Sequence, residues 1–136
     1  MPMISVQVAT PTPSRELAAS IAATVSDHTA RILRKDPAVT AVAVEFIEPH
    51  HWFVGGASCA ALGVAAFFVD VRVSDGTNTK EEKSSYVAET FAALRGLLNG
   101  AHAESYVHVN DVHADAYGFG GVTQERRFIE AHPLPA

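Results

Sequence analysis

The chain has 136 residues, of which 48% are apolar and 18% are charged, and its formal net charge is −5. This length suits one domain with a sizeable core, and the composition is that of a soluble globular protein. The negative charge and the scattered arginines argue against nucleic-acid binding. The single cysteine, Cys59, excludes an internal disulfide and a cysteine-rich metal site. No signal-peptide pattern or membrane-length apolar run is present, so a cytoplasmic protein without a membrane partner is predicted.

The first half of the chain is predicted to fold as strand, helix, strand. ISVQVA at 4–9 and AVAVEFI at 41–47 are the two strands. Between them a helix is predicted from Ser14 to Arg34, with Ser14 as its N-cap and an Asp-Pro pair after its end. The apolar face of this helix is expected to be Leu17, Ile21, Val25 and Ile32.

The second half shows the same order. AFFVDVRV at 66–73 and SYVHVNDV at 105–112 predict strands, and TKEE at 79–82 is a capping box that opens a second helix. Asn99-Gly100 should stop that helix. Its apolar face is expected to be Val87, Phe91, Leu94 and Leu98.

The two halves align without a gap. WFVGG begins at Trp52 and YGFGG at Tyr117, and 117 − 52 = 65. The same offset separates the two helix caps and two strand valines, which are Ser14 and Thr79, and Val42 and Val107. Three landmarks with one offset indicate a duplicated βαβ unit.

The duplication predicts the fold. A βαβ unit joins two parallel strands by a right-handed crossover, so we predict an α/β fold with a four-stranded sheet and two helices on one face. Residues 1–136 form one domain in this interpretation, with repeats at about 2–56 and 67–121 and a tail at 122–136. The other sheet face should carry Val, Phe and Ala with nothing to cover it, which predicts an oligomer packed sheet to sheet. The paired glycines after each second strand suit tight hairpins.

These features together resemble the tautomerase superfamily. The resemblance rests on proline directly after Met1, the duplicated βαβ unit, and the aromatic-x-φ-Gly-Gly hairpins WFVGG and YGFGG, and it covers about residues 2–121. The superfamily includes 4-oxalocrotonate tautomerase, macrophage migration inhibitory factor, and small-acid dehalogenases and decarboxylases. The resemblance implies a homotrimer with three sheets wrapped into a barrel, and an N-terminal proline as the catalytic group.

The chemistry of such a proline follows from its amine. Removal of Met1 leaves Pro2 with a free secondary amine, and an ordinary α-amino group has a pKa of roughly 7.7–8.0. An apolar pocket or a nearby cation lowers the pKa of an amine. The neutral amine can then take a proton next to a carbonyl group and return it at another carbon, with no metal and no cofactor.

The resemblance also implies substrate-binding residues. Lys35 stands where the migration-inhibitory-factor pattern has a lysine that binds carboxylate. Asn110 matches an asparagine of the last strand, and His108 replaces a tyrosine two residues before it. Trp52 and Tyr117, the hairpin aromatics, would wall the pocket.

Other positions depart from the patterns. The arginines that hold dicarboxylates in 4-oxalocrotonate tautomerase align with Thr12 and Ala43, and the second half offers Thr77 and His108 instead. This argues against a dicarboxylate substrate. GTNTKEEK, at the start of the second helix, lacks the arginine pair of the dehalogenases and decarboxylases.

The favoured function is therefore a cofactor-independent keto–enol tautomerase acting on a small 2-oxo or 2-hydroxy unsaturated acid, with Pro2 as general base. One alternative is a hydratase, dehalogenase or decarboxylase of a three-carbon acid, with protonated Pro2 as acid. The other is a non-catalytic oligomeric binding protein, in which Pro2 is only a starting residue and Lys35 a solvated charge at a helix end. Arg126 and Arg127 are interpreted as surface charges, with an option of reaching a neighbour's site.

Overall fold

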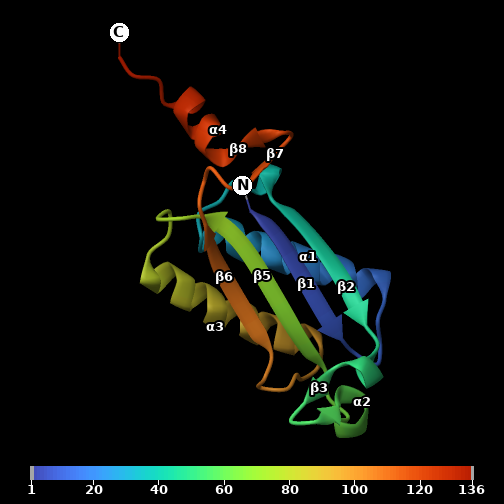
Figure 1. Cartoon of the computed structure of the whole chain (residues 1–136). Helices are drawn as coiled ribbons and strands as arrows, with labels where there is room; N and C mark the ends of the chain where they lie inside the picture. Colours follow the sequence, from blue (N-terminus) through green and yellow to red (C-terminus); the bar gives the residue numbers. More distant parts are fainter. Residues whose placement is uncertain (1, 136) are drawn as a thin grey trace.

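The computed structural model describes residues 2–135. Met1, whose removal the proline hypothesis requires, lies outside the described residues. The chain forms one four-stranded sheet. Figure 1 shows this sheet with the long helices behind it and a small hairpin unit at each end. Among the described residues, no helix has both the length and the apolar character that crossing a bilayer demands.

The sheet has the strand order β2-β1-β5-β6. Strands β1 and β2 are parallel, β5 and β6 are parallel, and β1 and β5 are antiparallel. The four strands are β1 Met3–Ala9, β2 Ala41–Ile47, β5 Ala66–Ser74 and β6 Tyr106–Val112. Two βαβ units joined through their first strands give this order, and the predicted fold class is confirmed.

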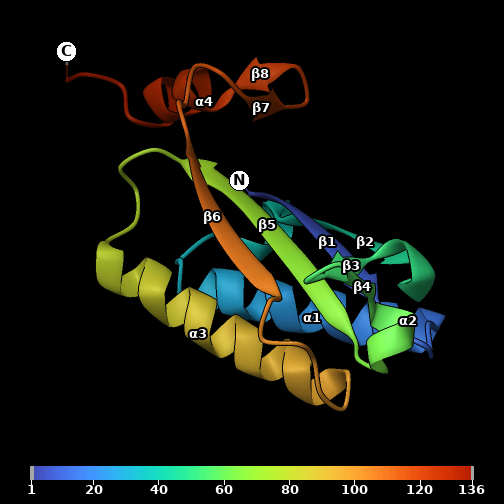
Figure 2. The ribbon, with the colours of Figure 1, turned by 60° about the horizontal axis from the view of Figure 1, so that its bottom comes forward.

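Helices α1 (Arg15–Arg31) and α3 (Lys80–Leu97) cover one face of the sheet, as Figure 2 shows. Both predicted caps are present. The amide of Leu17 donates to Ser14 Oγ at 3.0 Å, and Thr79 forms a complete capping box. Helix α1 ends before the predicted Arg34, because Arg34 has a left-handed φ of 62° that an α-helix cannot contain.

The buried face of α3 differs from the prediction. Val87 is 39% exposed, and the fully buried positions are Tyr86, Thr90 and Leu94. The two polar residues can be buried because they pair with α1. Thr29 Oγ1 lies 3.0 Å from Tyr86 Oη, and His28 Nδ1 lies 3.0 Å from Thr90 Oγ1. Burial raises the pKa of Tyr86 to about 12.

The two faces of the sheet also differ from the prediction. Strand alternation turns the valines toward the helices, where the core consists largely of Ile4, Val6, Val8, Phe67, Val69, Val71 and Val73. The face that no helix covers, called the open face below, mixes apolar and polar residues: Met3, Ser5, Gln7, Ala41, Ala43, Glu45, Phe68, Asp70, Arg72, Tyr106, His108 and Asn110. The prediction that the uncovered face carries Val, Phe and Ala is therefore wrong for the valines, which face the helices.

Each end of the sheet carries a hairpin followed by a helix. The first set is β3 Phe53–Val54, β4 Ala57–Ser58 and α2 Cys59–Leu62, and the second is β7 Gly118–Phe119, β8 Val122–Thr123 and α4 Gln124–Ala131. Short 3-10 helices precede β2 and β3, at η1 Pro37–Val39 and η2 Pro49–His51. Residues 122–131, which the sequence suggests belong to a tail, thus contain a strand and a helix.

Candidate active site

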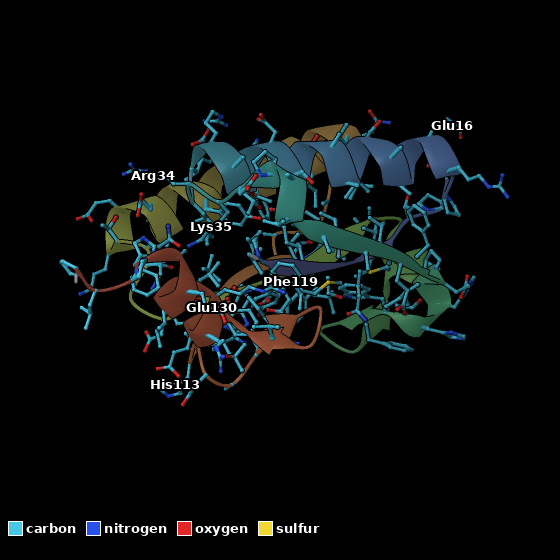
Figure 3. All side chains as sticks on the ribbon, turned by 90° about the horizontal axis from the view of Figure 1, so that it is seen from above. Glu16, Arg34, Lys35, His113, Phe119 and Glu130 are labelled. Carbon is cyan, nitrogen blue, oxygen red and sulfur yellow. The ribbon has the colours of Figure 1, made fainter. Side chains whose placement is uncertain are left out.

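A pocket of about 460 Å³ lies at the start of β1. Four segments of the chain meet there: the first residues of β1, the stretch from η1 to β2, the β7–β8 hairpin and the first residue of α4. The lining residues are Pro2, Met3, Ala38, Val39, Thr40, Ala41, Tyr117, Gly118, Phe119 and Gln124. Figure 3 looks onto this end of the molecule, with Phe119 on the side of the hairpin and Lys35 on the side of the helices. The walls are largely apolar, and we call this space the proline pocket.

Pro2 is buried and directly precedes β1. The amide of Ala41 donates to the Pro2 carbonyl at 3.1 Å, which ties the start of β1 to the start of β2. Proline suits a first strand position because it has no amide proton for the ladder. The Pro2 nitrogen is therefore free of any role in the sheet.

Tyr117 forms part of the pocket wall and is held from two sides. Its hydroxyl lies 3.0 Å from Ser74 Oγ at the end of β5, and its carbonyl accepts from the amide of Gln124 at 3.0 Å. The hairpin that carries it needs glycine at Gly118, where an added Cβ would lie 2.0 Å from the Val122 carbonyl oxygen.

Arg127 does not line the proline pocket itself but is a cation at its rim, in contact with the lining residue Phe119. It follows Gln124 by one turn on the same side of α4, its guanidinium lies 3.8 Å from the centre of the Phe119 ring, and Nη2 donates to the Phe119 carbonyl at 2.8 Å. Its Nε is buried without a hydrogen-bond partner among the described residues. A buried donor without a partner costs free energy, so an incoming acceptor here is favourable.

Two of the predicted site residues, Pro2 and Tyr117, line this pocket. Lys35 does not line it. Its Nζ donates to Thr77 Oγ1 at 2.8 Å, and partial burial lowers the pKa of Lys35 although Glu82 and Asp111 act in the opposite direction.

His108 and Asn110 lie on the open face of β6, outside the pocket of their own chain. His108 Nδ1 is 3.9 Å from Asp70 Oδ1. Asn110 is in register with Arg72, which is itself in register with Met3. Two strand spacings, about 10 Å, therefore separate Asn110 from the start of β1.

Trp52 directly precedes β3, which lies at the other end of the sheet (Figure 1), and it lines a different cavity. The reason is topological. Strand β2 runs parallel to β1, so the hairpin that follows β2 lies beyond the end of β1, whereas Pro2 lies at its start. Within one chain, each hairpin approaches the first strand of the other half, which brings Tyr117 and not Trp52 to Pro2.

Phe119 and Gln124, which line the pocket, and Arg127, which contacts Phe119, were not predicted from the sequence as site residues. A signal for them was available. The 65-residue offset relates Ser58 to Thr123, and both are N-caps whose side chains accept from a backbone amide three residues later. The repeat thus extends past residue 121 into α4.

Within residues 2–135, no three His, Cys, Asp or Glu side chains come close enough to hold a metal ion. His50, which is adjacent to His51 in the sequence, has its Nδ1 2.6 Å from Glu48 Oε1.

Comparison with models of protein families finds no match for the chain, and comparison with curated proteins finds none. Solved structures do match. A wild-type fused 4-OT described as a symmetric trimer has a TM-score of 0.78 and 16% identity, over 90% of this chain and 96% of that one. Pt0534 inactivated by 2-oxo-3-pentynoate has a TM-score of 0.79 and 14% identity, over 92% of this chain and 98% of that one.

FG41 malonate semialdehyde decarboxylase inhibited by 3-bromopropiolate has a TM-score of 0.72 and 18% identity, over 98% of this chain and 99% of that one. These are structures of the tautomerase superfamily. The chain therefore has the tautomerase-superfamily fold over nearly its whole length.

Proposed function

We propose that the chain, once Met1 is removed, is a cofactor-independent tautomerase of small 2-oxo or 2-hydroxy unsaturated acids. One observation carries the proposal: Pro2 is buried at the start of β1 in a largely apolar pocket of about 460 Å³. A secondary amine there is a base whose environment disfavours its protonated form. The fold neighbours, which include 4-OT structures, support the same chemistry.

The reaction follows from the amine. The Pro2 nitrogen takes the hydroxyl proton of the bound enol, and the carbonyl double bond forms as electron density shifts toward the neighbouring carbon. The ammonium form of Pro2 then returns the proton to that carbon. One proton is moved, nothing leaves, and the free amine is regenerated.

The residues around Pro2 have distinct roles in this proposal. Arg127 binds the substrate carboxylate, because it is the cation at the rim and its guanidinium is only partly engaged by Phe119. Tyr117, fixed by Ser74, holds the flat unsaturated chain of the substrate. One rim arginine suits a monocarboxylate better than a diacid.

The proposed active form is a homotrimer. The open face of the sheet carries exposed Met3 and Tyr106 beside a half-buried Asp70, whose Oδ1 is buried without a hydrogen-bond partner among the described residues. Such a face gains by being covered. The fused 4-OT neighbours are described as trimers, symmetric or asymmetric. In the proposed trimer, His108 and Asn110 contribute to the pocket of a neighbouring subunit.

The test is turnover by mature protein in which mass spectrometry has established loss of Met1. Ketonisation of the enol of phenylpyruvate, a monocarboxylate, is followed by absorbance for wild type, for Pro2→Ala and for the control Pro11→Ala, which changes an exposed proline. General base catalysis contributes about 10² to 10⁴ in rate, so Pro2→Ala should lose at least about 100-fold. Unchanged turnover in Pro2→Ala would exclude the proposal.

A second candidate is decarboxylation of a three-carbon 3-oxo acid. The fold match to malonate semialdehyde decarboxylase, which extends over 98% of this chain, favours it. In that case Pro2 acts in its protonated form as an acid or electrostatic group. Titration of the Pro2 amine by NMR separates the two, because a pKa well above 7 supports the acid and a lower one supports the base.

A further inference from the structure

A second cavity, of about 550 Å³, is the duplicate of the proline pocket at the opposite end of the sheet. Its lining includes Trp52, Phe53, Phe68, Glu104 and Tyr106. Each of these residues corresponds, through the 65-residue offset, to a lining residue of the proline pocket: Tyr117, Gly118, Met3, Val39 and Ala41. The two cavities therefore descend from one duplicated site, and we call the second one the aromatic cavity.

The aromatic cavity has lost the catalytic group. The position that corresponds to Pro2 is Phe67, which lies inside β5 and is fully buried. Its backbone amide donates to Ser105 Oγ at 3.2 Å, so this position offers no amine. Catalysis by an N-terminal proline is therefore impossible in this cavity.

The aromatic cavity has more aromatic lining residues than the proline pocket. Small or aliphatic residues of the proline pocket correspond to aromatic ones in three cases, at Phe53, Phe68 and Tyr106, whereas Phe119 corresponds to Val54, and Val39 corresponds to an acid, Glu104. With Trp52, four aromatic rings and one carboxylate line the space. The proline pocket has the opposite character, with an arginine at its rim.

The carboxylate is held in place by its neighbours. The Tyr106 hydroxyl donates to Glu104 Oε2, and this hydrogen bond raises the pKa of Tyr106. The Glu104 amide donates to His102 Nδ1 at 2.9 Å. His102 is fixed in turn, because its amide donates to the Ala65 carbonyl at 2.8 Å. Glu104 thus sits at a fixed position at the wall of the cavity.

Two aromatic rings of the cavity are exposed in the single chain: Phe53 is 62% exposed and Tyr106 is 57% exposed. Tyr106 belongs to the open face, so in the proposed trimer the aromatic cavity lies beside a neighbouring subunit, as the proline pocket with Met3 and Ala41 does. Among residues 2–135, the contact between a cationic side chain and an aromatic ring is that of Arg127 with Phe119, at the other end of the sheet. The rings of the aromatic cavity are therefore not occupied by a cation of the chain itself.

We propose that the aromatic cavity is a non-catalytic binding site for an organic ammonium ion, with the aromatic rings around its cationic head and Glu104 as its counter-charge. Aromatic faces attract cations, most strongly tryptophan, and sets of such faces recognise quaternary ammonium groups. The carboxylate adds charge attraction and repels acids of the kind proposed for the proline pocket. The formal charge of −5 favours cations at long range.

The experiment uses the single tryptophan of the chain as a reporter. Trp52 fluorescence of the full chain is titrated with choline and, separately, with 3,3-dimethyl-1-butanol, which has the same shape without the charge. Choline should change the Trp52 fluorescence until the signal saturates. Its affinity should be about threefold to tenfold higher than that of the neutral alcohol. Equal responses to both compounds, or none to choline, would overturn the proposal.

Two variants test the groups directly. Glu104→Gln removes the charge and Phe53→Leu removes an exposed ring, and each should weaken choline binding about threefold or more. Glu45→Gln, an acid on the open face of β2 away from this cavity, is the matched control and should bind as wild type. Because Phe53 is outside the core, its variant should keep the wild-type circular dichroism. Wild-type affinity in both variants would contradict the assignment. None of these readouts depends on turnover, so the result is independent of Pro2.

Discussion

Substitution of Arg127 by glutamine tests how the proline pocket holds its substrate. Glutamine removes the charge but keeps a side-chain amide that can still donate to the Phe119 carbonyl, which Arg127 Nη2 contacts at 2.8 Å. The hairpin should therefore stay in place while the carboxylate partner is lost. The carboxylate partner is lost because the buried Nε, which has no hydrogen-bond partner among the described residues, and the other guanidinium donors are proposed to bind the substrate.

The expected magnitude follows from the contacts. A hydrogen bond to a charged group contributes about 1.5–3 kcal/mol, which corresponds to a loss of about 10-fold to 150-fold in kcat/KM for an acid substrate. The contact of the guanidinium with the Phe119 ring, at 3.8 Å, contributes about 0.5–1 kcal/mol to the hairpin itself. The second, smaller effect falls on stability and is measured separately by thermal unfolding.

The assay compares the enol of phenylpyruvate with the enol of its methyl ester, which lacks the carboxylate charge. Arg127→Gln should lose the full factor on the acid and little on the ester. Arg126→Gln is the control, because Arg126 points to Glu130, with Nε 2.9 Å from Oε1, on the exposed side of α4. An equal loss on acid and ester would show that Arg127 only supports the hairpin, and no loss would remove it from the site.

Three further predictions concern the fold and the pocket. Gly118→Ala should lower the unfolding midpoint in urea, because its Cβ would lie 2.0 Å from the Val122 carbonyl oxygen. Gly96→Ala in α3 should instead raise the free energy of unfolding by up to about 1 kcal/mol, because no atom lies within 4 Å of the added Cβ. Equal effects of the two substitutions would contradict the hairpin geometry. Burial raises the pKa of Tyr86 to about 12 in the folded chain, so its contribution to stability is complete below pH 10 and is lost, on the order of 2–3 kcal/mol, as pH rises through 12. Tyr86→Phe should abolish that slope, and a persisting slope would assign it to another group. Tyr117→Phe should reduce kcat/KM several-fold, because it removes the hydroxyl that lies 3.0 Å from Ser74 Oγ and fixes the ring. Trp52→Phe, at the other end of the sheet, should leave kcat/KM unchanged. A loss in Trp52→Phe and none in Tyr117→Phe would place Trp52 in the active site.

Much of the fold could be predicted because the signals were local and occurred twice. Ser14 and the capping box at Thr79 set the helix starts, and the paired glycines set both hairpins, with φ of 60° and 85° at Gly55 and Gly56. One offset related them all. Strand periodicity in short apolar runs did not show which face each valine takes, and this led to the wrong open face.

The candidate site was harder to predict because it depends on which segments meet in space. Trp52 and Tyr117 look alike in sequence, and only the parallel pairing of β1 with β2 separates them. Tyr86 and Thr90 escaped notice as core residues because their burial depends on partners 57 and 62 positions away on α1. Arg127 was interpreted as a surface charge from the sequence, because its contact with Phe119 forms only when α4 folds back on the hairpin.

The most direct test of the central claim is the site of covalent labelling by 2-oxo-3-pentynoate, the compound named with inactivated Pt0534. A neutral Pro2 amine would add to the alkyne carbon distal to the ketone, and its proton would move to the adjacent carbon, so the mass rises by one whole reagent molecule. Burial raises the pKa of Cys59, which makes its thiol a poor competitor. We predict a single adduct on the peptide that begins with Pro2 and loss of turnover with the same time course. A native chain that keeps Met1, or an adduct elsewhere with Pro2 unmodified, would contradict the proline mechanism.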